Sequence, residues 1–313
     1  MREARTALEA AAAGPVSSVA GSLSAEPAGG PEFVSRDSAT DYKRKIADSQ
    51  HEISEGNSYE ICLTTTLEAA AGNLDPWSSY LALRRRNPAP FASYLRFGEL
   101  VVASTSPERF LRILSDGGMR AEPIKGTRRR SSDASEDAAL RQDLETSLKD
   151  RAENIMIVDL LRNDLSHFAI PGSVTVSRLC AIESYATVHQ MVSTIDAHLR
   201  PGAPRAEALA AAFPAGSMTG APKISTMDIL DQLESGPRGI YSGAIGYFSL
   251  NAATDLAVVI RTLVVNPDGA GGRTLSLGVG GAITADSVAD DEYEEIRTKA
   301  YGVLSTLGAD FPG

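Results

Sequence analysis

Two pairs of acidic residues have a spacing that could hold a metal ion. Asp150 and Glu153 lie three residues apart in DRAENIMIVDLLRNDL, and Glu292 and Glu295 lie three residues apart in DDEYEEIRTKA. Both segments are expected to be helical, so the two carboxylates of each pair would share one helix face. If the two faces converge, their oxygens suit a hard cation such as Mg²⁺, which is often shared with an anionic substrate. From spacing alone, two solvated acidic faces are the commoner arrangement.

Two glycine-bearing segments and one arginine could bind the carboxylates of a small anion. GSMTGAPK, at residues 216–223, runs from a loop into a helix, and backbone N–H groups at such a junction suit an anion beside Lys223. GVGGAIT, at residues 278–284, follows an expected strand, and its glycines allow backbone amides to approach a carboxylate closely. Arg261 ends the apolar run AVVIR and needs a partner, which is either a substrate carboxylate or a structural salt bridge. Together these features predict a pocket for a small polyanion with magnesium.

Lys125 and Glu108 are candidates for acid–base or nucleophilic chemistry. Lys125 lies in PIKGTRRR, after an expected strand at residues 119–122. A lone lysine is most often a surface residue, but burial in a dry pocket would lower its pKa from about 10.4 and free its amine as a nucleophile. Glu108, in SPERF, is the carboxylate upstream at an expected helix start. It could be a general acid, or a first-turn residue that faces a helix dipole.

The elements that must position these residues can be predicted from periodicity. Helices are expected at residues 41–55, 75–86, 133–165, 205–212, 222–235 and 288–307. Strands are expected at residues 59–67, 91–97, 100–104, 119–122, 174–182, 240–250, 257–265 and 274–280. Because strands arrive in runs rather than in strict alternation with helices, the fold class is α+β rather than a doubly wound parallel sheet.

Composition and charge exclude several classes of function. The 313-residue chain has a formal net charge of −10, which argues against nucleic acid or an anionic membrane as its main partner. No apolar run approaches the roughly 20 residues of a membrane-spanning helix. Only Cys62 and Cys180 are present, so reduced thiols in the cytoplasm are expected rather than a disulfide scaffold. Residues 1–38, rich in Ala, Gly, Ser and Pro, are predicted to be a disordered or linker-like leader, with 39–308 as one large domain and 309–313 as a tail.

The motifs, taken in order, resemble the chorismate-utilising enzymes, a family that includes anthranilate synthase component I, aminodeoxychorismate synthase component I, isochorismate synthase and salicylate synthase. The resemblance extends from about residue 41 to residue 307, as the family's catalytic, chorismate-binding domain. The matching segments are SPERF, PIKGT, DRAENIMIVDLLRNDL, YATVHQMVS, FPAGSMTGAPK, GIYSGAIGY, AVVIRTLVV, GVGGAITADS and EYEEIRTKA. The family's N-terminal part is not recognisable here, which indicates either a natural variant with a minimal catalytic region or a truncated reading frame.

This resemblance implies a fold and a set of site residues. The fold would be two facing β-sheets flanked by helices, with Mg²⁺ held by carboxylates. Glu153 and Glu295 would be the principal metal ligands, with Asp150 and Glu292 supporting them directly or through water. His189 would lie near the substrate ring and the departing hydroxyl. The residues implied to bind or enclose chorismate are Thr219, Lys223, Tyr247, Arg261, Gly278, Gly280 and Gly281.

Within the family, Lys125 favours the aminodeoxychorismate synthases, which supply 4-aminobenzoate for folate or an aryl-amine natural product. Anthranilate synthases usually have PIAGT at this motif, whereas this chain has PIKGT. The resemblance implies that Lys125 forms a covalent adduct with the ring while Glu108 assists as an acid. Neither cysteine lies in a glycine-flanked elbow, so a separate glutamine amidotransferase subunit, or free ammonia, would supply nitrogen. Anthranilate synthase component I remains the alternative enzyme, and a non-catalytic chorismate-binding subunit is the alternative of another class.

Overall fold

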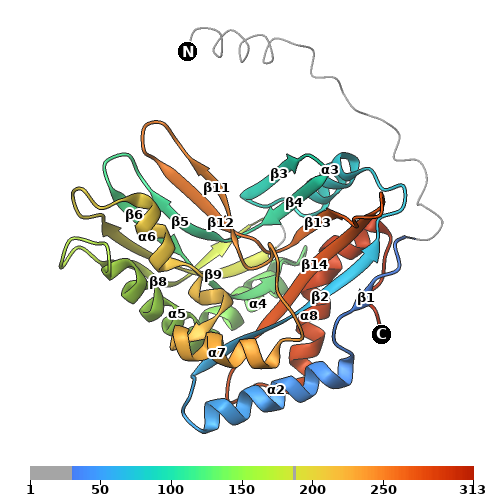
Figure 1. Ribbon diagram of the computed structural model, residues 1–313. Helices are drawn as coiled ribbons and strands as arrows, with labels where there is room; N and C mark the ends of the chain where they lie inside the picture. The colour runs from blue at the N-terminus through green and yellow to red at the C-terminus, as the bar shows by residue number, and fades with distance from the viewer. Residues whose placement is uncertain (1–29, 186–187) are drawn as a thin grey trace.

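Two antiparallel β-sheets face each other, and helices cover their outer sides (Figure 1). The computed structural model describes residues 30–185 and 188–313. Each sheet has seven strands, and every strand pair is antiparallel. The α+β class and the two facing sheets predicted from the sequence are therefore confirmed.

The first sheet contains two 11-residue strands, β2 (Glu60–Ala70) and β14 (Arg273–Ile283), which pair with each other. Its order is β1 (Val34–Ser35), β2, β14, β13 (Thr262–Pro267), β4 (Leu100–Ser106) and β3 (Phe91–Phe97), with β10 (Gly220–Ala221) pairing with β2. Helices α2 (Ala39–Ser54), α3 (Pro76–Arg86), α7 (Lys223–Leu233) and α8 (Ala289–Leu304) pack beside it. The first eight residues of β2 are all buried, because protein covers both of its faces.

The second sheet has the order β11 (Ala244–Phe248), β12 (Thr254–Val258), β5 (Arg109–Ile113), β6 (Gly118–Glu122), β9 (Val188–His198) and β7 (Ile124–Arg129), with β8 (Thr175–Ser184) pairing with β9. Helices α4 (Ala134–Thr146), α5 (Leu148–Ser166) and α6 (Arg205–Ala212) belong to this half of the molecule. The short 3₁₀ turns are η1 (Gly216–Met218) and η2 (Ser305–Leu307). Each sheet has its own apolar core against its helices, and a smaller cluster of Val102, Ile245, Ala257 and Val259 joins β4 to the β11–β12 hairpin.

Two expected elements are each divided in the structure. The long helix predicted over residues 133–165 breaks at Ser147, which ends α4 and caps α5 by accepting a hydrogen bond from the Asp150 N–H. The strand predicted over residues 257–265 is cut at residues 259–261, and Arg261 there has a positive φ of 49°. As a result β12 lies in the second sheet and β13 in the first, so the chain crosses between the sheets at Arg261.

The ends of the predicted domain are more structured than expected. Most of the predicted leader, residues 1–29, lies outside the described residues. Residues 30–38 are not linker-like, because β1 pairs with β2 and the Asp37 carboxylate forms a buried 2.6 Å ion pair with Lys45. The predicted tail is also packed, since the Phe311 ring lies 6.0 Å from that of Tyr293.

In the part of the chain that the structure describes, no helix has the length and apolarity needed to cross a bilayer.

Candidate active site

An ion pair between the two sheets lies at the centre of the candidate site. Lys125, on β7 of the second sheet, donates from Nζ to Glu60 Oε1 at 2.6 Å, and Glu60 is the first residue of β2 in the first sheet. The Glu60 side chain is 1% exposed and that of Lys125 is 12% exposed. The lysine is therefore not the solvated surface residue that a lone lysine would usually be.

The charge state of Lys125 differs from the expected one. Burial by itself would lower the pKa of the Lys125 ammonium, but the carboxylates of Glu60 and Glu153 outweigh it and raise that pKa above its usual value. The expectation of a lowered pKa is therefore wrong. Lys125 is an ammonium in this arrangement, and its amine would need a proton acceptor in order to act as a nucleophile.

Glu108 faces the same region from the link between β4 and β5. The expected helix start at SPERF is wrong, since residues 107–108 connect two strands. The Glu108 carboxylate is buried and accepts a 2.8 Å hydrogen bond from the Ser217 hydroxyl in η1. Burial raises the pKa of Glu108, and the Ser217 hydrogen bond and the charges of Lys125, Lys299 and Arg261 only partly oppose it. A carboxyl that retains its proton to higher pH suits a general acid.

One carboxylate from each predicted acidic pair lies near the same lysine. Lys149 Nζ lies 4.0 Å from Glu153 Oε1 and 3.5 Å from Glu292 Oε1, so it bridges α5 and α8. Burial raises the pKa of Glu153 to about 7, with the positive charge of Lys125 opposing this shift. Ser287 donates to Glu292 Oε1 at 2.8 Å and thereby orients this buried carboxylate at the start of α8.

Glu295 lies one helical turn further along α8 and next to β14. Its Oε1 is 2.6 Å from Lys299 Nζ, which also donates to the Gly280 carbonyl at 2.9 Å. A methyl group added at Gly281 would lie 3.3 Å from Glu292 Oε2 and 3.8 Å from Glu295 Oε1. The absence of a side chain at Gly281 therefore leaves room beside both carboxylates.

The donor set of Glu153, Glu292 and Glu295 fits a hard divalent cation. Glu292 Oε2 is buried and has no hydrogen-bond partner among the described residues, so it has an acceptor position to offer. Within the described ranges 30–185 and 188–313, no three His, Cys, Asp or Glu side chains yet converge as a closed set of metal ligands. Lys149 lies between the carboxylates of Glu153 and Glu292 and neutralises part of their charge. A bound cation would neutralise these carboxylates in place of Lys149.

Asp150 is oriented differently from the other three predicted acids. Its Oδ2 accepts a 3.0 Å bond from Arg128, which also pairs with Asp143 at 2.6 Å. The carboxylate of Asp150 is therefore engaged by the arginine that follows the PIKGT motif.

Arg261 and the glycines of β14 lie where the first sheet leaves an edge unpaired. β14 pairs with β2 from Thr274 to Ile283, but its pairing with β13 stops at Leu277. The neighbouring strand β13 begins only after Arg261, so within residues 30–185 and 188–313 no strand pairs with Gly278 to Gly281 on that side. Solvent reaches the Arg261 side chain, yet protein crowds it enough to lower its pKa, an effect that Glu108 opposes. Among the described residues Arg261 forms no ion pair, so this cation and the adjacent amide edge suit a substrate carboxylate.

Four other predicted site residues have contacts of their own. His189 bonds through Nδ1 to the Ser184 hydroxyl at 2.8 Å and through Nε2 to Asp137 at 3.2 Å. Lys223 Nζ donates to Asp164 at 2.7 Å. The buried Thr219 accepts at its carbonyl from the Cys62 N–H at 2.8 Å, while Tyr247 on β11 is 58% exposed. Among the described residues, no hydrogen bond or ion pair joins these four side chains to Lys125, Glu108 or the acidic cluster. Residues 186–187 of the YATVHQMVS motif lie outside the described residues.

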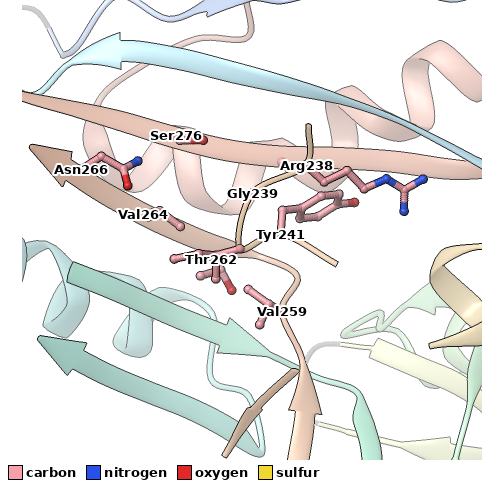
Figure 2. Close-up of a pocket in the computed structure, with 10 residues that line it drawn as sticks. Arg238, Gly239, Tyr241, Val259, Thr262, Val264, Asn266 and Ser276 are labelled. Atoms are coloured by element: carbon pink, nitrogen blue, oxygen red, sulfur yellow. The ribbon is translucent and has the colours of Figure 1, made fainter. Parts of the chain in front are cut away.

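A small pocket of about 110 Å³ lies beside this centre, on the face of β13 and β14 (Figure 2). Its lining shares only Gly278 with the predicted site residues, and Figure 2 shows the Tyr241 ring between the loop at Gly239 and the strand. A methyl group at Gly278 would lie 2.1 Å from Tyr241 Cγ, so this glycine makes room for the ring. The pocket therefore supports the strand rather than containing the reactive groups.

Sequence reasoning missed Glu60, Lys149, Lys299 and Ser217. A signal existed for three of them. Glu60 is a charged residue that opens the apolar, β-branched run EICLTTTL, and such a charge needs a partner when the strand is buried. Lys149 and Lys299 each lie four residues from a predicted ligand on the same helix face. Ser217 had no comparable signal, because its role depends on a loop that meets Glu108 only in the folded chain.

Comparisons with known proteins identify related sequences. Residues 3–305 match the family model described as chorismate binding enzyme. The aminodeoxychorismate synthase of Streptomyces griseus is 55% identical over 272 residues, which is 87% of this chain and 37% of that protein. The aminodeoxychorismate synthase component 1 of Salmonella typhimurium is 40% identical over 267 residues, covering 85% of this chain and 57% of that protein.

A solved structure resembles the fold closely. The crystal structure of anthranilate synthase component I from Streptococcus pneumoniae superposes with a TM-score of 0.78 at 30% identity, covering 88% of this chain and 60% of that chain. Like the two sequence relatives, this protein is longer than the present chain, which spans between 37% and 60% of the three proteins compared.

Proposed function

The chain belongs to the chorismate-binding enzyme family, and from this premise we propose that it acts as an aminodeoxychorismate synthase component I. The reaction would convert chorismate and ammonia to 4-amino-4-deoxychorismate, the precursor of 4-aminobenzoate. Relatives with this name, at 55% and 40% identity, support the assignment. The chain spans only part of the length of these relatives, so the activity, substrates and partners of the whole proteins are part of this proposal.

The single observation that carries the proposal is the placement of Lys125. Its amine is nearly enclosed between the two sheets, next to the Glu60 carboxylate, and it senses the charges of Glu153 and Glu108. An anthranilate synthase reaction needs no amine from the protein at this position, whereas a reaction through a covalent lysine adduct requires one.

In the proposed steps, residues of this chain supply the nucleophile and move the protons. The neutral Lys125 amine adds to C2 of chorismate, the two ring double bonds shift, and the C4–O bond breaks. Glu108 gives its proton to the departing hydroxyl, which leaves as water. Ammonia then adds at C4, the double bonds shift back, and the C2–N bond to Lys125 breaks. The new C4 ammonium returns one proton to Glu108, which restores the acid.

Mg²⁺ is the proposed cofactor, and Glu153, Glu292 and Glu295 are the residues that would hold it. When bound, the ion supplies charge stabilisation for the ring carboxylate. Arg261 and the unpaired edge of β14 from Gly278 to Gly281 would orient the same anion, because they offer a cation and backbone amides side by side.

Ammonia would come from a separate glutamine amidotransferase subunit. Both cysteines are buried, and burial raises the pKa of each thiol, so neither is an activated nucleophile. Native mass spectrometry with a candidate glutaminase subunit tests this partner. A complex at micromolar concentration supports it, and its absence counts against it.

A product assay with chorismate, Mg²⁺ and ammonium tests the proposed activity. The expected product is aminodeoxychorismate, which a lyase converts to 4-aminobenzoate. Lys125→Ala should lose at least about 100-fold in turnover, because the nucleophile is removed. Lys43→Ala, which removes a surface lysine of α2, is the matched control and should retain activity. Fluorescent anthranilate with pyruvate, or full turnover by Lys125→Ala, would contradict the proposal.

A further inference from the structure

We propose that Glu60 is the positioning residue of Lys125: it fixes the amine between the sheets, takes its proton when the amine adds to the ring, and returns that proton when the amine leaves. This inference rests on the proposed function, since it assigns a role within the lysine-adduct reaction. Glu60 acts through Lys125 and is not itself placed on the substrate.

The backbone around Glu60 is held from several directions. Ala221 of β10 is its partner across the ladder, and the Ser58 hydroxyl donates to the Glu60 carbonyl at 3.0 Å. Gly220 approaches so closely that a methyl group there would lie 1.9 Å from the Glu60 carbonyl oxygen. The carboxylate therefore extends from a fixed point, and its Oε1 meets Lys125 Nζ at 2.6 Å.

The second oxygen of Glu60 distinguishes this pair from a purely structural salt bridge. Glu60 Oε2 is buried and has no hydrogen-bond partner among the described residues. A buried ion pair contributes little net stability unless its remaining lone pairs are satisfied, so an unsatisfied oxygen is costly for a pair that serves only the fold. It suits a carboxylate that must accept a proton at Oε1, because the loss of negative charge on protonation weakens no hydrogen bond at Oε2.

The proton transfers balance over the reaction. Before addition, Lys125 gives one proton to Glu60 and becomes a neutral amine. Addition to C2 forms a bond from the amine nitrogen and breaks the C4–O bond, with Glu108 protonating the oxygen. When ammonia adds at C4 and the C2–N bond breaks, the departing amine recovers its proton from Glu60. Glu60 thus starts and ends each cycle as a carboxylate next to an ammonium.

The groups that face Lys125 come from four elements. On β2 they are Glu60 and Cys62, on α5 Glu153, on the β4–β5 link Glu108, and on α8 Glu295. Among the residues that the structure describes, only Glu60 forms a hydrogen bond with the ammonium. Substitution of Glu60 should therefore change the titration of Lys125 more than any other single change.

Competitive acetylation across a pH series, read by mass spectrometry on the peptide that contains Lys125, tests this role without an activity assay. Glu60→Gln should shift the labelling midpoint of Lys125 down by about one pH unit or more, because burial remains while the opposite charge is gone. Glu68→Gln on the same strand is the matched control, since Glu68 is exposed and faces Arg36 at 3.6 Å. It should leave the midpoint unchanged. An unshifted midpoint in Glu60→Gln overturns the proposal.

Kinetics with chorismate, Mg²⁺ and ammonium give the second readout. Glu60→Gln should lower kcat about 100-fold or more with a smaller effect on the KM for chorismate, as expected for a lost proton acceptor. Glu60→Asp keeps the charge, so it should fold, keep the labelling midpoint close to that of the wild type and recover part of kcat. Equal kcat in Glu60→Gln and the wild type overturns the role of Glu60. A wild-type enzyme that forms no aminodeoxychorismate overturns the proposed function instead, so the two failures are distinguished.

Discussion

At the scale of single residues, the site balances its own negative charge with lysines. Lys125 neutralises Glu60, Lys149 lies between Glu153 and Glu292, and Lys299 pairs with Glu295. These three pairs differ in burial: the Lys125 pair is nearly enclosed, whereas the Lys149 side chain is 56% exposed and that of Lys299 is 40% exposed. The exposed lysines can swing into solvent when a ligand enters, but Lys125 cannot.

Ser217 provides a test of Glu108 as the acid. The Ser217 hydroxyl stabilises the Glu108 carboxylate, so Ser217→Ala should raise the pKa of Glu108 further above its usual value. An acid with a higher pKa keeps its proton to higher pH, so the alkaline limb of the kcat profile should move upward. The shift should be up to about one pH unit, since a hydrogen bond to a charged group is worth about 1.5 kcal/mol. Ser225→Ala on α7 is the control, since the Ser225 hydroxyl donates to the Asn57 carbonyl and not to Glu108. An alkaline limb that stays in place or moves downward in Ser217→Ala contradicts the assignment.

Lys149 provides a test of the metal site. Lys149→Met should tighten Mg²⁺ binding several-fold, about 1 kcal/mol after solvent screening, because a competing cation is removed from between Glu153 and Glu292. Without Mg²⁺ the same variant should unfold at a lower temperature, because the two carboxylates repel. Isothermal titration calorimetry and thermal unfolding measure these effects. Arg151→Met, on the same helix and without an ion pair among the described residues, is the control; unchanged Mg²⁺ affinity in Lys149→Met would argue against this metal position.

Sequence patterns marked candidate site residues, but they did not predict the partners that these residues contact. The acids of α5 and α8 and Lys125 could be identified because motif and spacing mark them. The pairing of Asp150 on α5 with Arg128 on β7, and of Lys125 on β7 with Glu60 on β2, depends on contacts between separate elements of the fold. Local spacing carries no information about such contacts, so the pKa of Lys125 was predicted in the wrong direction.

At the scale of elements, the division of one expected strand shapes the side of the candidate site that is proposed to bind substrate. Periodicity over residues 257–265 is continuous in the sequence, because both halves are buried and apolar. The break at residues 259–261 accompanies the packing of the two sheets, because β12 pairs in the second sheet and β13 pairs in the first. Arg261 adopts a positive φ there and ends beside the unpaired edge of β14. A one-dimensional pattern predicts burial, but it does not predict which sheet a strand joins.

Two glycines of β14 should respond differently to the same substitution. Gly278→Ala would place a methyl group 2.1 Å from Tyr241 Cγ, so it should lower the free energy of unfolding by about 1–3 kcal/mol. Gly281→Ala would place it 3.3 Å from Glu292 Oε2, so the fold should be nearly unaffected while Mg²⁺ binding weakens. Urea unfolding and calorimetry measure the two effects. Equal losses of stability in both variants would contradict the separation of structural and ligand-binding roles along this strand.

At the scale of the whole molecule, the site joins the two sheets. Glu60 and the β14 glycines come from the first sheet and Lys125 from the second, while α5 and α8 bring acids from opposite halves (Figure 1). The α+β class and the facing sheets could be predicted, since motif order and strand runs indicated them. The packed segment at residues 30–38 could not, because two residues of β1 gain their structure only by pairing with β2.

Because the site spans both halves, ligands should stabilise the molecule as a unit. Mg²⁺ and chorismate, each at about 100 times its Kd, should each raise the free energy of unfolding by about 2.7 kcal/mol, and the unfolding midpoint should rise by several degrees in one transition. Sodium chloride at matched ionic strength is the control for Mg²⁺, and Glu295→Gln should lose most of the Mg²⁺ shift while retaining part of the chorismate shift. Hydrogen exchange should slow in β2, β14 and β7 together. Protection confined to one sheet, or two separate transitions, would mean that the ligands do not bridge the halves.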